Sequence, residues 1–425
     1  MAAESRTMLF FLILCISLCF TESGFALDKN DKNCAACHKV TLTGAHKAQK
    51  CESCHARNAD HFDRAADFSK GAAGCLNCHR EYAGITDSAM VHRSAEKVFV
   101  SKSFERYDGG FWDKNCKNCH VQSCSDCHRS ENPHSIKKPS ADDCQECHRD
   151  YYTGIEYSGL GQREDHERYQ RGREHKGGKY ASMLKDVHFE KGMQCGDCHS
   201  MKSLAEGRKF SKTCTDCHQF NKNSSVEHSI PEHGRMECYT CHSAWANQEY
   251  GTFWIYMRDT KFSEYFRWVK RPHLDYAKSS HTKQYADFPI GVNERKKYSP
   301  LRPQFIGFVT RIEKDRVIGK ENEMVSSDFR AVFPHTVRRE TVLCESCHAD
   351  NRRLMRERMD ERIYHTDRDG LPFPTFYNGK WFSVTNGRFV NDSEFKRIKS
   401  KGAKYNKALL KKWQQVTKTV ENSKK

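Results

Sequence analysis

The pattern Cys-x-x-Cys-His occurs ten times in this chain of 425 residues. In each copy, two residues separate the cysteines and a histidine directly follows the second one. Cysteines at this spacing add through sulfur to the two vinyl groups of a haem, and the histidine lies under the iron as its proximal ligand. Zinc sites and disulfides are the alternatives, but neither requires a histidine after every second cysteine. The pattern therefore predicts ten covalent haems c.

The predicted haem-binding residues account for 20 of the 22 cysteines. The cysteines are Cys34, Cys37, Cys51, Cys54, Cys75, Cys78, Cys116, Cys119, Cys124, Cys127, Cys144, Cys147, Cys195, Cys198, Cys214, Cys217, Cys238, Cys241, Cys344 and Cys347. The predicted proximal iron ligands are His38, His55, His79, His120, His128, His148, His199, His218, His242 and His348. The remaining two cysteines lie in an apolar segment near the amino terminus, so none is left for a structural disulfide.

Nine motifs fall within residues 34–242, and their spacing suggests three groups of three. The segments CHREYAGI at 78–85 and CHRDYYTGI at 147–155 end the first two groups with similar sequences. The closest motifs share the segment 116–128, CKNCHVQSCSDCH. Eight residues span about 12 Å as a helix and at most about 28 Å when extended, so these two haems should be close neighbours.

The other histidines supply candidates for the sixth iron ligand, because a neutral imidazole is the usual partner in a low-potential haem. Those among the nine clustered motifs are His46, His61, His92, His134, His166, His175, His188, His228 and His233. The strongest are His188, seven residues before a motif, and His46 and His233, each five residues before one. For each, the alternative is a surface histidine on a polar loop. The nearby methionines are expected to serve packing.

Residues 1–26 have the features of a secretory signal peptide: Arg6, a thirteen-residue apolar core and small residues before Leu27. The core is too short to span a bilayer comfortably. Lipidation is disfavoured, because leucine precedes both Cys15 and Cys19. Since c-type haem is attached outside the bacterial inner membrane, we expect a periplasmic or extracellular protein.

The formal charge of +16 would ordinarily suggest nucleic acid or an anionic membrane as partner. A ferric haem with two ionised propionates carries about −1, so ten haems offset most of this excess. We therefore expect no nucleic-acid partner. Hydrophobic residues make up only 37% of the chain, so porphyrins should replace much of the aliphatic core and folding should depend on haem insertion.

The expected fold class is mostly α and irregular in a nine-haem domain at 27–243, with α+β structure in a C-terminal domain at 244–425 that holds one haem. Residues 305–320 look like two strands around 313–315, and Asn-Gly pairs at 378 and 386 are hairpin signals. An Arg-rich helical stretch is expected over 351–364. Residues 404–420 predict a helix with one apolar face, which packs on its own domain or contacts a membrane surface or a partner.

The chain resembles the multihaem c-type cytochromes of anaerobic, metal- and sulfur-respiring bacteria. The segments GLGQREDHERYQRG at 159–172, DVHFEKGMQCGDCH at 186–199 and FPHTVRRETVLCESCH at 333–348 look like periplasmic cytochromes associated with quinol oxidoreductase complexes. A broader similarity is to the octahaem tetrathionate reductase and hydroxylamine oxidoreductase group. Such relatives often carry another haem motif after CYTCHSAW, where this chain reads EYGTF at 249–253. The resemblance implies redox partner proteins, with a membrane complex of b-type cytochrome and iron-sulfur subunits as the electron donor.

Three functions follow as hypotheses. The first is an electron carrier that is not itself an enzyme. The second is a reductase of a small oxyanion, such as nitrite, tetrathionate or selenite, at one open-coordinate haem. Its candidates are the motif at Cys344 with His273, His281, His335 and His365, and Arg338 and Arg339 as oxyanion or propionate partners. The third is a structural conduit subunit of a larger assembly.

Overall fold

The computed structural model describes residues 38–40, 42–55, 65–117, 120–129, 131–132, 134–148, 156–158, 171–175, 178–182, 186–244, 247–261, 270–284, 288–356 and 383–423. The predicted signal peptide, Cys34, Cys37, Cys119, His61, His166, His365, the Asn-Gly pair at 378 and residues 357–364 lie outside them.

The chain forms two compact units. The first contains Met1–Cys78 and Ser123–Lys138, and the second contains His79–Gln122 and Pro139–Lys425. The division passes between the two motifs of the segment 116–128. The second unit includes residues on both sides of position 243, and the division into a nine-haem and a C-terminal domain stays a prediction.

The described helices of the first unit are short, and α2, α3 and α7 contain motif residues. They are η2 (Gly44–His46), α2 (Cys51–Cys54), η3 (Phe68–Lys70), α3 (Ala73–Leu76) and α7 (Ser125–His128). A β carbon at Gly74 would lie 2.3 Å from the carbonyl oxygen of Cys54, so only glycine permits this approach of α3 to α2. The backbone N–H of Cys124 donates to the carbonyl of Ala66 at 3.1 Å. Three motifs are thereby held together.

Apart from the last helix, the described helices of the second unit are also short. They are η4 (Arg80–Asp87), α4 (Ala89–His92), α5 (Ser94–Lys102), α6 (Phe111–Asn115), α8 (Ala141–Gln145), α9 (Val187–Glu190), α10 (Cys195–Cys198), α11 (Met201–Glu206), η7 (Arg208–Phe210), η8 (Cys214–Asp216), α12 (Val226–Ser229), η9 (Pro231–Arg235), α13 (Cys238–His242), α14 (Cys344–His348) and η11 (Arg352–Leu354).

Capping residues set where several motif helices begin. Asp197, inside the motif that starts at Cys195, accepts from the backbone N–H of Gln194 at 2.7 Å. Asp216 does the same for Thr213 at 2.5 Å in the next motif. These reciprocal bonds satisfy N–H groups that the first helical turn leaves open. The variable positions of the motif therefore help to shape it.

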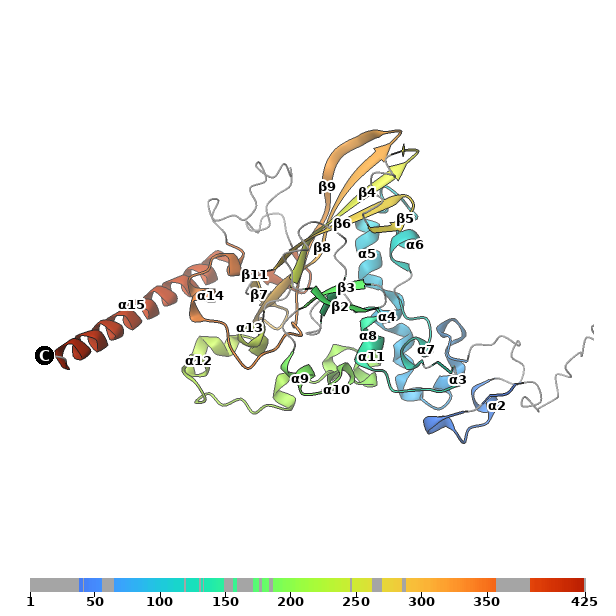
Figure 1. The fold of residues 1–425 in the computed structure, drawn as a ribbon, viewed down its shortest axis with the longest axis horizontal. Helices are drawn as coiled ribbons and strands as arrows, with labels where there is room; N and C mark the ends of the chain where they lie inside the picture. Colours follow the sequence, from blue (N-terminus) through green and yellow to red (C-terminus); the bar gives the residue numbers. More distant parts are fainter. Residues whose placement is uncertain are drawn as a thin grey trace, which may run out of the picture. The chain divides into compact units, whose positions relative to one another are not determined.

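The sheets belong to the second unit (Figure 1). The larger sheet has the order β10-β9-β8-β4-β6-β5, with β7 and β11 beside it. Its strands are β4 (Asn247–Arg258), β5 (Lys270–His273), β6 (Tyr276–Gln284), β7 (Ile290–Asn293), β8 (Tyr298–Glu313), β9 (Arg316–Ala331), β10 (Ser383–Val384) and β11 (Gly387–Phe389). The smaller sheet has the order β1-β3-β2, with β1 (Glu156–Ser158), β2 (Arg171–His175) and β3 (Gly178–Ser182).

The hairpin expected at 305–320 is formed by β8 and β9, and its strands extend well beyond that range. Lys314 and Asp315 make the turn with φ values of 48° and 61°. The Asn-Gly pair at 386 does not join two paired strands, because β10 pairs with β9 and β11 pairs with β7. The Asn386 side chain bonds both the N–H and the carbonyl of Ala331, at 2.8 and 3.1 Å. This contact holds the turn against the end of β9.

Aromatic residues from the segment before Cys116 and from strands β4 and β6 form the core between α5, α6 and the sheet. Phe104 and Phe111 stack with ring centroids 4.2 Å apart, and Trp254 and Tyr276 meet Phe111 edge-on at 5.1 and 5.3 Å. Phe104, Phe111 and Tyr276 are each at most 2% exposed. A second cluster contains Ile290 and Leu354, with Cys347 packed against it. The sheet therefore supports the tenth motif.

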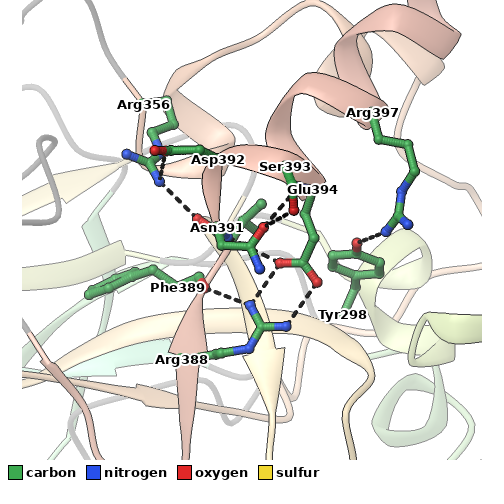
Figure 2. Close-up of polar contacts among 10 residues, drawn as sticks. Tyr298, Arg356, Arg388, Phe389, Asn391, Asp392, Ser393, Glu394 and Arg397 are labelled. Carbon is green, nitrogen blue, oxygen red and sulfur yellow. Dashed lines mark hydrogen bonds and ion pairs between the residues drawn. The ribbon is translucent and has the colours of Figure 1, made fainter.

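The last helix, α15 (Asp392–Ser423), is fixed at its first turn by a polar cluster (Figure 2). Arg388 binds both carboxylate oxygens of Glu394, at 2.7 and 2.8 Å. Glu394 also accepts from the N–H of Asn391, whose side chain accepts from the N–H of Glu394. This reciprocal cap ties the helix to β11. In the part of the chain that the structure describes, no helix is long and apolar enough to cross a bilayer.

Candidate haem-ligand site

Five motif histidines each face one histidine from elsewhere in the chain. The pairs, with the distances between their ring centroids, are His55–His134 at 6.2 Å, His199–His335 at 6.1 Å, His218–His188 at 6.0 Å, His242–His228 at 6.2 Å and His348–His233 at 6.5 Å. The first pair lies in the first unit and the others in the second.

This spacing fits one metal ion between two imidazoles. Ring nitrogens that bind an ion at about 2 Å from opposite sides place the ring centroids about 6 Å apart. In each pair, one imidazole belongs to a Cys-x-x-Cys-His motif and the other does not. The donor set therefore fits a c-type haem with a proximal and a distal histidine.

Hydrogen bonds at Nδ1 orient these rings. His233 Nδ1 donates to the carbonyl of Glu227 at 3.0 Å, and His348 Nδ1 to the carbonyl of Ile398 at 2.9 Å. His199 and His228 bond the hydroxyls of Ser211 and Ser224, at 3.1 and 2.7 Å. A proton on Nδ1 leaves the lone pair on Nε2, which is the form that a metal binds.

Asp186 gives His188 a charged partner. Its carboxylate accepts from Nδ1 of His188 at 2.8 Å and from the N–H of His188 at 2.9 Å. The other carboxylate oxygen accepts from the N–H of Val337 at 2.9 Å, two residues after His335. Asp186 is only 6% exposed. The Asp186 carboxylate therefore orients His188 and also binds the segment that contains His335.

Burial favours the neutral form of two of the facing histidines, which is the form that can bind a metal. Desolvation and the neighbouring His199 lower the pKa of His335 to about 4. Burial likewise lowers the pKa of His233. Both imidazoles are thus neutral near pH 7, with a lone pair available for an iron.

Thiols of different motifs lie close together. Hydrogen bonds with Cys144 and Cys214 lower the pKa of Cys195 to about 7 and that of Cys238 to about 6. In the first unit, the bond with Cys124 lowers the pKa of Cys75 to about 7. In the second unit these contacts place successive motifs side by side, whereas the contact in the first unit joins the motifs at Cys75 and Cys124.

Further pKa shifts connect other motif cysteines of the second unit. Burial raises the pKa of Cys198, and the nearby Cys217 raises it further. Burial and the neighbouring Cys347 raise the pKa of Cys241 to about 11. The motifs that start at Cys144, Cys195, Cys214, Cys238 and Cys344 therefore follow one another in space in their sequence order.

Arginines gather near one end of this series. Burial lowers the pKa of Arg330, and Arg208 and Arg302 lower it further. Arg302 also lowers the pKa of His335, after burial and His199. Guanidinium groups bind carboxylates in a bidentate manner, so these residues fit the haem propionates. Arg338, a predicted oxyanion partner, instead forms an ion pair with Glu190 at 3.0 Å.

The histidines that face the motif histidines are not the ones that sequence distance favours. His188 and His233 precede the motifs at Cys195 and Cys238, yet they face His218 and His348. His335 was expected near the tenth motif, yet it faces His199. Backbone bonds from Val187 to Val337 at 2.8 Å and from Arg338 to His242 at 2.7 Å hold the segment after β9 against α9 and α13.

The other predicted histidines have diverse surroundings. His46 lies on η2 and His175 ends β2. His92 lies on α4, with Nε2 3.6 Å from Asp87. His273 Nδ1 accepts from the N–H of Asp275 at 3.2 Å. Asp186 was not predicted, although an aspartate two residues before a histidine is a local signal that could have found it.

No protein-family model, no curated protein and no solved structure matches the chain. The haem assignment rests on the ten motifs and on the paired imidazoles.

Proposed function

We propose that the protein is an exported multihaem cytochrome c that relays electrons between a quinol-oxidising membrane complex and a periplasmic or extracellular acceptor. The observation that carries the proposal is the set of five facing histidine pairs, each with one motif histidine. A bound haem supplies one-electron chemistry at its iron. The resemblance to multihaem cytochromes supports the same function.

The residues of the chain suit this task in two ways. Histidines on both sides would keep an iron six-coordinate in either redox state, and their Nδ1 bonds limit movement of the rings. The contacts between thiols of successive motifs would keep neighbouring cofactors close. Ligands that stay in place and short separations both favour rapid electron transfer.

The reductase hypothesis needs an iron with an open position. Its main candidate was the tenth motif, where His233 now lies opposite His348. Arg338, a candidate oxyanion ligand, is engaged by Glu190. These contacts favour the carrier over the reductase.

Electron paramagnetic resonance of the oxidised holoprotein tests the proposal. A carrier should give low-spin signals from the five paired sites, unchanged by nitrite or cyanide. A high-spin signal that shifts with these ligands, together with turnover of an oxyanion by the dithionite-reduced protein, would favour the reductase.

A further inference from the structure

The C-terminal half of α15 has an exposed apolar face. Leu410, Trp413, Val416 and Val420 are 63%, 62%, 46% and 48% exposed. At 3.6 residues per turn, these four side chains lie within an arc of about 120°. A tryptophan and three aliphatic residues on one face are unusual for a helix that contacts only water.

The N-terminal half of the same helix packs against its own unit. Phe395 and Ile398 pack against the cluster that contains Ile290 and Leu354. A β carbon at Gly402 would lie 2.4 Å from Cβ of His348, so the helix passes very close to the tenth motif. The helix is thus anchored at one end, with an apolar face uncovered at the other.

The charge of this segment indicates what covers the face. Residues 404–425 contain seven lysines and one acidic residue. Lys407, Lys411 and Lys418 are exposed, and at 3.6 residues per turn they lie on the polar face, away from the apolar residues. A basic helix with an apolar face that includes tryptophan has the composition of helices that lie in a membrane interface, with lysines directed to anionic headgroups.

We propose that the C-terminal half of α15 docks on an anionic lipid surface. The charge argues against a second copy of this helix as the occupant, because two segments that each carry seven lysines and one acidic residue would repel each other.

The docking would also place the tenth motif near the membrane, a step that rests on the proposed relay function. The carbonyl of Ile398 accepts from His348 Nδ1, and the Lys399 amine donates to the carbonyl of Cys347 at 3.4 Å. At 1.5 Å per residue, Leu410 lies about 18 Å along the helix from Ile398. The motif at Cys344 would then be the one nearest to a membrane-bound electron donor.

Vesicle flotation with the full-length holoprotein tests the docking. Wild type should float with vesicles of equal parts phosphatidylglycerol and phosphatidylcholine, and not with phosphatidylcholine alone. The triple variant Leu410→Gln, Trp413→Gln, Val420→Gln and the charge variant Lys407→Glu, Lys411→Glu, Lys418→Glu should each bind at least about tenfold more weakly. The matched control is Val226→Gln with Leu274→Gln, at side chains 70% and 79% exposed elsewhere in the unit; it should bind like wild type.

Wild type that fails to float with anionic vesicles, or a triple variant that floats like wild type, would overturn the proposal. A different outcome would be a wild-type protein that sediments as a dimer without vesicles while the triple variant does not. That result would assign the apolar face to a second copy of the chain. The haem absorption spectrum, recorded on every variant, reports the relay cofactors independently, so a failure of docking leaves the proposed function separately testable.

Discussion

At the scale of residues, the Nδ1 partner distinguishes otherwise similar histidine pairs. His188 has a buried carboxylate, Asp186, whereas His199, His228 and His233 bond a hydroxyl or a carbonyl. A carboxylate partner makes an imidazole a stronger donor and stabilises the oxidised iron. The His188–His218 site should therefore have a lower midpoint potential than its neighbours.

Asp186→Asn should shift the midpoint potential of this site to more positive values, because a neutral amide replaces the carboxylate. Redox titration followed by electron paramagnetic resonance measures the change. Ser211→Ala, which removes a neutral partner of His199, serves as the control and should change the potential less. Unchanged potentials in Asp186→Asn would show that the carboxylate has only a structural role.

A second prediction concerns the tenth motif. His233→Ala should leave one haem with an exchangeable position, seen as a high-spin signal that cyanide or added imidazole converts to low spin. His273→Ala is the matched control, since His273 bonds the backbone of Asp275, and should leave the spectrum unchanged. If His273→Ala gave the high-spin signal and His233→Ala did not, His273 would be the sixth ligand of this haem instead of His233.

At the scale of elements, the cap of α15 combines a buried carboxylate with a guanidinium. The Arg388 bond lowers the pKa of Glu394 from its ordinary value of 4.5, against the opposing effect of burial. The Glu394 side chain is only 8% exposed, whereas the Arg388 side chain is 48% exposed, so solvent partly screens the pair. The start of the helix that borders the tenth motif therefore depends on an ionised glutamate.

Glu394→Ala should destabilise the first turns of α15 by about 1–2 kcal/mol, because it removes the cap on the N–H of Asn391 and the ion pair with Arg388. Hydrogen exchange of the α15 amides measures this, with Glu421→Ala near the far end of the helix as the control. Since the folded pKa is depressed, the stabilisation is present above pH 4.5 and is lost as the pH falls through the folded value. The difference between wild type and variant should therefore shrink on acidification; a constant difference would contradict the ionic role.

At the scale of the whole molecule, one measurement tests both the number of haems and the cleavage of the signal peptide. The intact mass of protein from a host that attaches c-type haem should correspond to a chain beginning at Leu27 with ten haem increments. The expectation has a covalent basis, since every motif keeps both cysteines and its histidine. Fewer increments would reduce the predicted count, and retained residues before Leu27 would refute the cleavage site.

The sequence alone predicted the features that depend on neighbouring residues. Haem attachment needs five consecutive positions, so the ten predicted sites could be read without a fold. The β8–β9 hairpin and the last helix follow from local periodicity, and the structure contains both.

Only the tertiary structure decided which residues meet across the chain. His335 faces His199 because the segment after β9 folds back on α9, a contact made by backbone hydrogen bonds and the buried Asp186. The structure also decided which half of α15 is covered by its own unit. Periodicity marks one apolar face along 404–420, and the structure shows that Trp413, Val416 and Val420 on this face are exposed. A local sequence pattern predicts which group a residue can bind, whereas the tertiary fold determines which distant residues it contacts.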